Sequence, residues 1–133
     1  MIIQLNAASG VPLYLQIIEQ VKHAIEIGSI RSGEQLPSVR QMAEELTVNP
    51  NTIAHAYKEL EHEGIVELRH GSGAFISESV MPRSSLMLKA QTVARAAVKR
   101  LSSLNLTEDE IRRLIQNELT LLGARQTKKK RVS

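Results

Sequence analysis

The stretch from Leu36 to Ile76 constrains the fold of this chain more than any other. It contains two short helical patterns, followed by two short strand patterns that flank a pair of glycines. This order is typical of a winged helix-turn-helix, in which the second helix of the pair can lie in the major groove of DNA while a β-hairpin wing reaches the flanking backbone. The pattern predicts a mainly α-helical DNA-binding domain with a small β-hairpin.

Apolar periodicity and capping residues place three helices in this domain. Between residues 12 and 28 apolar residues recur every three or four positions, with proline at the expected first helical position and glycine just past the end. Ser38 and Gln41 match a capping box that opens the second helix, and Asn49 before Pro50 predicts the start of the third. The side chains expected to be buried are those of Tyr14, Ile17, Ile18, Val21, Ala24, Ile25, Val39, Met42, Ala43, Leu46, Ile53, Ala56, Tyr57 and Leu60.

The predicted wing follows Gly64, which is expected to end the third helix. Residues 65–69 are rich in β-branched and apolar side chains, 70–73 form a glycine-rich turn, and 74–77 make a second short strand. A polar, glycine-rich tip of this kind can approach another backbone closely.

Beyond the wing, serines and a proline mark a linker, and two amphipathic helical stripes follow. Thr107 and Glu110 match a capping box that opens the second stripe, which is expected to end before Gly123. Two helices of this length cannot enclose a core alone, so their apolar faces need another surface. The predicted organisation is a winged helix-turn-helix over 1–79, a two-helix dimerisation segment over 80–124 and a basic, disordered tail over 125–133.

The composition excludes several classes of protein. The 133 residues include no cysteine, which removes disulfides and thiolate metal sites, and the three aromatic residues are too few for a base-stacking platform. The chain begins without a basic, apolar export signal, and no segment approaches the ~20 apolar residues of a membrane span. These features predict a cytoplasmic protein without a membrane partner.

The charge is divided unevenly along the chain. Residues 1–79 carry five basic and ten acidic side chains, a net charge of −5, whereas residues 80–133 carry twelve basic and four acidic ones, a net charge of +8. The predicted DNA-binding half is therefore the acidic half. Its affinity for phosphates must depend on where its few cations lie.

The predicted recognition helix begins with polar side chains. Asn49, Asn51 and Thr52 lie where free backbone N–H groups and the positive end of the helix dipole favour a phosphate or a base edge. Asn49 has the alternative role of a simple N-cap. Further along the same polar side, His55 and Lys58 are candidate groove contacts.

Two other segments supply candidate contacts with DNA. Arg40 lies in the first turn of its helix, where the dipole disfavours a cation, so we predict an anionic partner; the alternative is an ion pair with Glu44. Arg69, His70 and Gly71 lie at the hairpin turn, where a wing would meet the backbone or the minor groove; the alternative is a solvated turn.

Metal binding and catalysis find little support in the sequence. His55, Glu59 and His62 are spaced to share one helical face, but no second segment offers a further ligand, so no metal is predicted. The carboxylates lie on predicted exposed faces, without a phosphate-binding loop or a nucleophile constellation. We predict no catalytic residues, no cofactor and no enzymatic activity.

Taken together, the motifs of residues 11–77 resemble the GntR family of bacterial transcription regulators. The similarity lies in Pro12-Leu13-Tyr14, Gly33 to Arg40, Leu46, Val48 to Thr52, Ala56-Tyr57, Leu60-Glu61, Glu63-Gly64 and Gly71-Ser72-Gly73. The short helical C-terminal segment is similar to that of the YtrA-type subfamily, in which a small helical dimerisation region replaces a large effector-binding domain.

This resemblance implies a homodimeric repressor that binds a palindromic operator in double-stranded DNA. It also implies DNA contacts by Ser38, Arg40, Asn49, Asn51, Thr52, His70 and Gly71. Where some relatives carry an arginine one turn into the recognition helix, this chain has Ala54 beside His55, which removes a candidate guanine contact.

Other functions remain open at this stage. A winged-helix protein-interaction module without specific DNA binding fits the acidic balance of the domain. The head of a pyridoxal-phosphate enzyme is disfavoured, because only about 50 residues follow the wing. The sequence leaves a small-molecule effector unidentified, together with the operator and the regulated genes.

Overall fold

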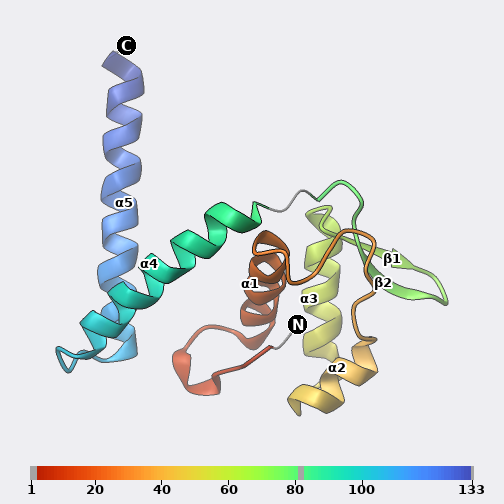
Figure 1. Ribbon diagram of the computed structural model, residues 1–133. Coiled ribbons are helices and arrows are strands. Elements are labelled where there is room, and N and C mark those ends of the chain that lie inside the picture. Colours follow the sequence, from red (N-terminus) through yellow and green to blue (C-terminus); the bar gives the residue numbers. More distant parts are fainter. Residues whose placement is uncertain (1–2, 81–82, 133) are drawn as a thin grey trace. The chain divides into compact units, whose positions relative to one another are not determined.

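The computed structural model describes residues 3–80 and 83–132, with side chains described as far as residue 127. The chain divides into two compact units, Met1–Ala90 and Gln91–Ser133. The division falls inside helix α4 (Ser84–Ser102), eleven residues beyond the predicted end of the first domain at residue 79. Figure 1 shows the order of the elements along the chain.

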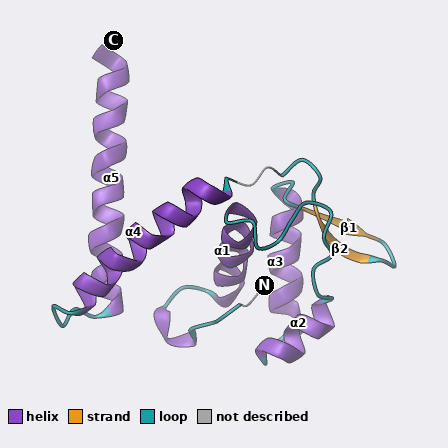
Figure 2. Cartoon of the chain, in the orientation of Figure 1, coloured by secondary structure: helices purple, strands orange, loops and turns teal. Residues whose placement is uncertain are grey.

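The first unit contains the three predicted helices and the predicted hairpin, as Figure 2 shows. A short 3-10 helix precedes them and the first turns of α4 follow them. In chain order the elements are η1 (Ala7–Ser9), α1 (Leu13–Glu26), α2 (Val39–Leu46), α3 (Pro50–His62), β1 (Val66–Arg69) and β2 (Gly73–Ile76).

The predicted helix boundaries have the expected backbone chemistry. The Ser38 hydroxyl accepts the N–H of Gln41 and the Gln41 side chain accepts the N–H of Ser38, each at 3.0 Å, so the capping box is present. Gly28 and Gly64, with φ values of 78° and 77°, follow α1 and α3 in the left-handed conformation. Pro12 differs slightly from expectation: it is the N-cap, with an extended ψ of 140°, because α1 begins one residue later.

Helix α3 is the centre of the core. It packs against α1, α2 and β1, and Ile53, Ala56, Tyr57 and Leu60 on its inner face are fully buried. The Tyr57 hydroxyl donates a 2.6 Å hydrogen bond to the Pro37 carbonyl, just before α2 begins. Burial of this apolar face therefore fixes both helices of the helix-turn-helix on one scaffold.

The wing is an antiparallel pair in which Val66 lies opposite Ile76 and Arg69 lies opposite Gly73. Its inner residues Val66, Ala74 and Ile76 are buried in the same core. The segment before α2 also pairs with β2, through a bridge between Gln35 and Phe75. Consequently β2 is hydrogen-bonded along both edges.

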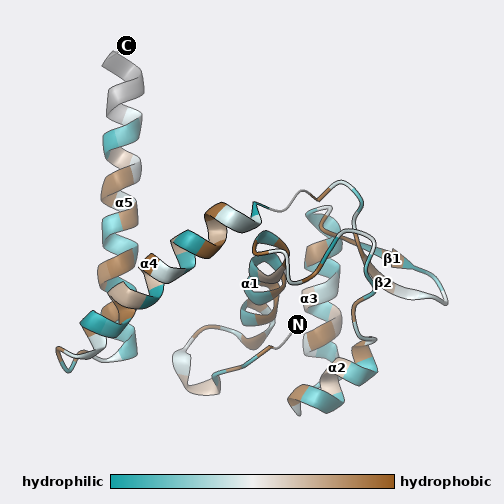
Figure 3. Ribbon diagram, viewed as in Figure 1, coloured by the Kyte–Doolittle hydropathy of each residue, from teal (hydrophilic) through white to brown (hydrophobic). Residues whose placement is uncertain are grey.

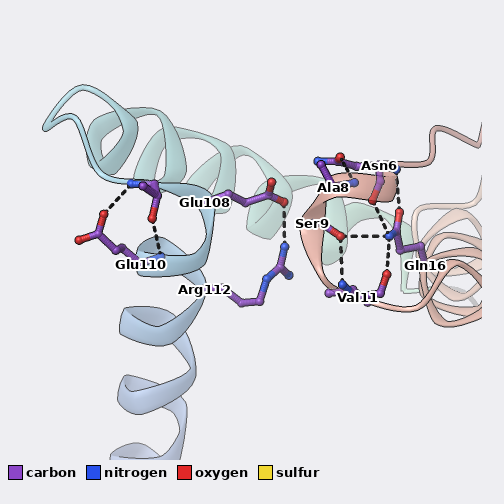
Figure 4. A network of polar contacts seen from close by, with 9 residues as sticks. Asn6, Ala8, Ser9, Val11, Gln16, Glu108, Glu110 and Arg112 are labelled. Carbon is purple, nitrogen blue, oxygen red and sulfur yellow. Dashed lines mark hydrogen bonds and ion pairs between the residues drawn. The ribbon is translucent and has the colours of Figure 1, made fainter.

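Two glutamines of α1 hold the N-terminal segment, as Figure 4 shows for Gln16. The Gln16 amide nitrogen donates to the carbonyls of Asn6 and Val11 at 2.9 and 2.8 Å, and its oxygen accepts the N–H of Asn6. Gln20 makes the same two-way contact with the backbone of Gln4. The start of α1 is thereby fixed.

The second unit contains the C-terminal part of α4 and helix α5 (Glu108–Val132). Thr107 and Glu110 form the predicted capping box: the Thr107 N–H donates to the Glu110 carboxylate at 2.9 Å, and the Glu110 N–H donates to the Thr107 hydroxyl at 3.1 Å. Hydrogen bonding from the backbone and side chain of Thr107 lowers the pKa of the Glu110 carboxyl. Most apolar side chains of α5 remain well exposed, including Leu119 at 55% and Leu122 at 50%. Figure 3 shows apolar segments alternating with polar ones along this helix.

The expected helix end at Gly123 and the unstructured tail from residue 125 are wrong, because α5 continues to Val132. A glycine inside a helix costs only about 1 kcal/mol relative to alanine. Apart from Thr127, the residues from 124 to 130 are alanine, arginine, glutamine and lysines, which favour helix. The helix-forming residues after Gly123 therefore outweigh the tendency of this glycine to end the helix.

No helix in the described part of the chain is long and apolar enough to cross a membrane.

We expect Tyr57→Phe to lower the free energy of unfolding by about 1 kcal/mol at pH 7, because it removes the hydrogen bond to Pro37. Burial, with a smaller contribution from Glu45, raises the pKa of Tyr57. The stability contributed by this hydroxyl is therefore fully present below the ordinary tyrosine pKa of about 10, and it is lost as the pH rises from there toward the folded-state pKa.

Urea unfolding at a series of pH values tests this expectation, and the gap between wild type and Tyr57→Phe should narrow above about pH 10. Tyr14→Phe is the control, since Tyr14 is only partly buried. A constant gap at all pH values would contradict the role given to the Tyr57 hydroxyl.

Candidate nucleic-acid interface

The N-terminus of α3 has the capped geometry that the sequence predicts. Asn49 is extended, and its side-chain oxygen accepts the N–H of Asn51 at 2.8 Å. The Asn51 side chain is exposed and Thr52 is partly buried. The structure therefore shows Asn49 as a cap and leaves Asn51 and Thr52 facing out of the first turn.

One turn further along α3, His55 is held by a residue of α1. Its ring stacks on that of Tyr14 with centroids 4.0 Å apart and planes inclined by 21°, and its Nε2 lies 3.8 Å from the Glu59 carboxylate. A shallow hollow beside the pair is lined by Leu13, Tyr14, Asn51, Thr52 and His55. The stacking fixes the direction of the His55 ring, so this polar surface is ordered before any partner binds.

Arg40 forms the ion pair with Glu44 that the sequence left open as an alternative to an anionic partner. Its Nε lies 3.4 Å from a Glu44 carboxylate oxygen, in an i,i+4 pair on α2. The Arg40 side chain is 90% exposed, and ion pairs this exposed contribute about 0–1 kcal/mol. The contact with Glu44 is therefore weak enough for Arg40 to exchange it for a phosphate or a guanine.

At the wing, the three predicted contact residues differ in their surroundings. Arg69 lies over the Phe75 ring, with its guanidinium carbon 4.2 Å from the ring centroid, and it also pairs with Glu67 at 3.4 Å. His70 and Gly71 are exposed at the tip, where Gly71 has a φ of 77°. In the free protein Arg69 is thus folded back onto the hairpin, whereas His70 and Gly71 face solvent.

The structure brings the start of α2 and the wing tip together across an open groove. Its lining includes Ser38 and Gln41 from α2 and Gly71 and Gly73 from the wing, with Gln35 between them. The predictions from sequence missed Gln35, whose side chain donates to the Ser72 carbonyl at 2.8 Å. Such a contact spans 37 positions, and no local sequence pattern encodes it.

The acidic balance of this unit is visible in its ion pairs. Lys22 pairs with Glu63 at 2.9 Å, and this hydrogen bond raises the pKa of Lys22. Arg40 and Arg69 also pair with glutamates, whereas Lys58 is exposed and makes no ion pair within the part of the chain that the structure describes. Most of the cations near the candidate interface are therefore partly neutralised before binding.

The candidate metal ligands His55, Glu59 and His62 do not form a site. Within residues 3–80 and 83–127, no group of three histidine, aspartate or glutamate side chains is arranged to hold a metal ion.

Comparisons with known proteins match this chain to one family of regulators. The family model described as bacterial regulatory proteins, gntR family, matches residues 13–76. The HTH-type transcriptional repressor YtrA of Bacillus subtilis is 41% identical over 99 residues, which cover 74% of this chain and 75% of that protein. YhcF of the same organism, an HTH-type transcriptional regulator, is 41% identical over 104 residues, covering 77% of this chain and 86% of YhcF.

Solved structures show the same similarity. A transcriptional antiterminator from Listeria monocytogenes EGD-e matches with a TM-score of 0.58 and 28% identity, over 89% of this chain and 90% of that one. YtrA from Sulfolobus acidocaldarius, described as a GntR-family transcription factor, matches with a TM-score of 0.57 and 27% identity, over 77% of this chain and 99% of that one.

The two asparagines at the tip of α3 should respond differently to truncation. We expect Asn49→Ala to lower the free energy of unfolding by about 1 kcal/mol, because it removes the N-cap hydrogen bond. Asn51→Ala should change stability by less than about 0.5 kcal/mol, because its side chain is exposed. Urea unfolding measures both, and a larger loss for Asn51→Ala would contradict this division of roles.

Proposed function

We infer that this chain, which belongs to the gntR family of bacterial regulatory proteins, is a cytoplasmic repressor that binds a palindromic operator in double-stranded DNA as a homodimer. The observation that carries this proposal is the tip of α3. A capped helix presents the exposed Asn51 and the half-buried Thr52 at its first turn, as a recognition helix must when it enters the major groove.

In this proposal the contacts with DNA come from three segments. On α3, Asn51, Thr52 and His55 face the bases and Lys58 faces the backbone, while Asn49 mainly caps the helix. On α2, Ser38 and Arg40 contact the backbone or a guanine. On the wing, His70 and Gly71 reach the backbone or the minor groove, and Arg69 joins them if it leaves Phe75.

The proposed dimer rests on the apolar surface of the second unit. A groove of about 500 Å³ in that unit is lined by five apolar side chains, Leu101 of α4 and Leu114, Ile115, Leu119 and Leu122 of α5, together with the charged residues Glu118 and Arg125. A largely apolar surface of this kind on a helix pair is stabilised by a partner, and a second copy supplies the same surface by symmetry. Residues 1–79 then act as the DNA-binding domain and residues 80–124 as the dimerisation region.

A two-fold symmetric protein requires two half-sites related by a dyad, which is the physical reason for a palindromic operator. Dimerisation also compensates for the weak electrostatic attraction between one acidic winged domain and DNA. Because each domain has few free cations, joining two of them raises the effective concentration of the second at its half-site.

The alternative is a winged-helix module that binds a basic protein instead of specific DNA. The net charge of −5 over residues 1–79 is the observation that favours it. Membership of a family of transcription regulators and the polar tip of α3 favour binding to an operator. Neither proposal involves catalysis, a metal or a cofactor. A small-molecule effector stays unidentified in both.

Selection from a randomised duplex library tests the proposal. We expect the recovered sequences to share an inverted repeat, and fluorescence anisotropy should show affinity for them falling with added salt. Arg40→Ala should weaken binding to the selected duplex by about 1–3 kcal/mol, and weaken binding to random DNA less.

Arg112→Ala is a matched control for Arg40→Ala, because Arg112 forms the corresponding i,i+4 pair with Glu108 in the second unit. Equal losses on selected and random DNA would mean that Arg40 contacts phosphate alone. Weak binding without sequence preference by the wild type would contradict the regulator and favour the protein-interaction module.

The dimer interface predicts the effect of a charge in the apolar groove. Leu119→Glu should convert the dimer to a monomer in sedimentation velocity, because it places a carboxylate in the groove of the second unit. Leu119 is 55% exposed within one chain, so this substitution should leave the fold of the monomer intact. Gln116→Glu, on an exposed position outside the groove, adds the same charge as a control, and an unchanged dimer in Leu119→Glu would contradict the interface.

A further inference from the structure

We propose that Gln35 is a positioning residue that holds the wing tip at a fixed place relative to the start of α2. This inference rests on the proposed DNA-binding function, which gives the position of the wing its importance. The central contact is the hydrogen bond from Gln35 Nε2 to the Ser72 carbonyl, at 2.8 Å. It joins the segment that leads into α2 to the turn of the hairpin.

Backbone pairing attaches the wing along β2 but stops two residues short of Ser72. The N–H of Gly33 donates to the carbonyl of Ile76, the N–H of Ile76 donates to the carbonyl of Glu34, and the N–H of Leu36 donates to the carbonyl of Ala74, each at 2.8 Å. Among the described backbone bonds, this ladder ends at Ala74. The Gln35 side chain extends the attachment to Ser72, at the tip.

The backbone of Gly73 leaves the space that the Gln35 amide occupies against the wing. A Cβ at position 73 would lie 2.9 Å from Gln35 Nε2, closer than side chains in proteins approach one another. The φ of Gly73 is 110°, a conformation that other residues rarely adopt. The absence of a side chain at position 73 therefore allows the amide of Gln35 to reach the Ser72 carbonyl.

The other wing contacts stiffen the hairpin without fixing its direction. Arg69 contacts Phe75 and Glu67, and all three residues belong to β1 or β2. Gln35 instead lies three residues before the N-cap Ser38, in the lining of the groove that separates α2 from the wing tip. It thus sets the spacing between the proposed contacts on α2 and those at His70 and Gly71.

Such preorganisation raises affinity because the tip does not have to be ordered during binding. The hydrogen bond is exposed to solvent, so its effect is modest. Its loss should reduce affinity for the selected duplex roughly 3- to 10-fold, the range for one ordinary hydrogen bond.

The test uses the full chain and three variants of Gln35. Gln35→Met keeps the length of the side chain and removes the donor, Gln35→Asn keeps the amide but shortens its reach, and Gln35→Lys keeps a donor. Gln116→Met is the matched control, since Gln116 is exposed in the second unit. The first readout needs no DNA: amide hydrogen exchange at residues 70–73, where the N–H of Ser72 is bonded to the Arg69 carbonyl.

We expect faster exchange at residues 70–73 in Gln35→Met and Gln35→Asn, recovery in Gln35→Lys, and no change in Gln116→Met. In hydroxyl-radical footprints of the selected duplex, Gln35→Met should lose protection where the wing lies, at the edges of each half-site, and retain it where α3 lies. A general loss of stability would instead weaken both regions together.

Unchanged wing-tip exchange in Gln35→Met would overturn the proposal, as would a uniform loss of the footprint accompanied by a lower melting temperature. Failure of the wild type to bind any selected duplex would overturn the proposed function, while the exchange measurement would still decide whether Gln35 positions the tip. The two failures are therefore distinguishable.

Discussion

The winged unit depends on the burial of one face of α3 against α1 and α2. Ile53, Ala56, Tyr57 and Leu60 have exposures of 2% or less, so α3 cannot rotate without exposing its apolar side chains to water. The direction of the opposite face is fixed by the same constraint, so Asn51 already faces outward before any DNA binds. The position of the candidate recognition surface is thus a consequence of core packing.

Local sequence chemistry predicted most of the helices and the hairpin. Capping depends on residues three positions apart, as in Ser38 with Gln41 and Thr107 with Glu110, so it can be read directly from the sequence. Contacts between distant segments leave no such local pattern in the sequence. The predictions therefore missed the stacking of His55 on Tyr14 and the hydrogen bond from Gln35 to Ser72. The end of α5 was predicted wrongly because a single glycine signal was given more weight than the helix-forming residues after it.

Charge imposes the second constraint on function. A domain with twice as many acidic as basic side chains in residues 1–79 cannot rely on a broad positive field to attract DNA. The pairing of Arg40 with Glu44 and of Lys22 with Glu63 reduces that field further. Recognition must then depend on a few correctly placed groups, and positional errors become costly, because few other attractive contacts exist to compensate for them.

This dependence gives a reason why a side-chain contact holds each proposed contact segment in place. The start of α2 is held by the Tyr57 hydroxyl at Pro37, the His55 ring by Tyr14, and the first turn of α3 by the Asn49 cap. In our proposal Gln35 does the same for the wing. An acidic domain can bind a polyanion specifically when its contacts are ordered in advance, since the entropy of ordering them is then lost on folding and does not weaken binding.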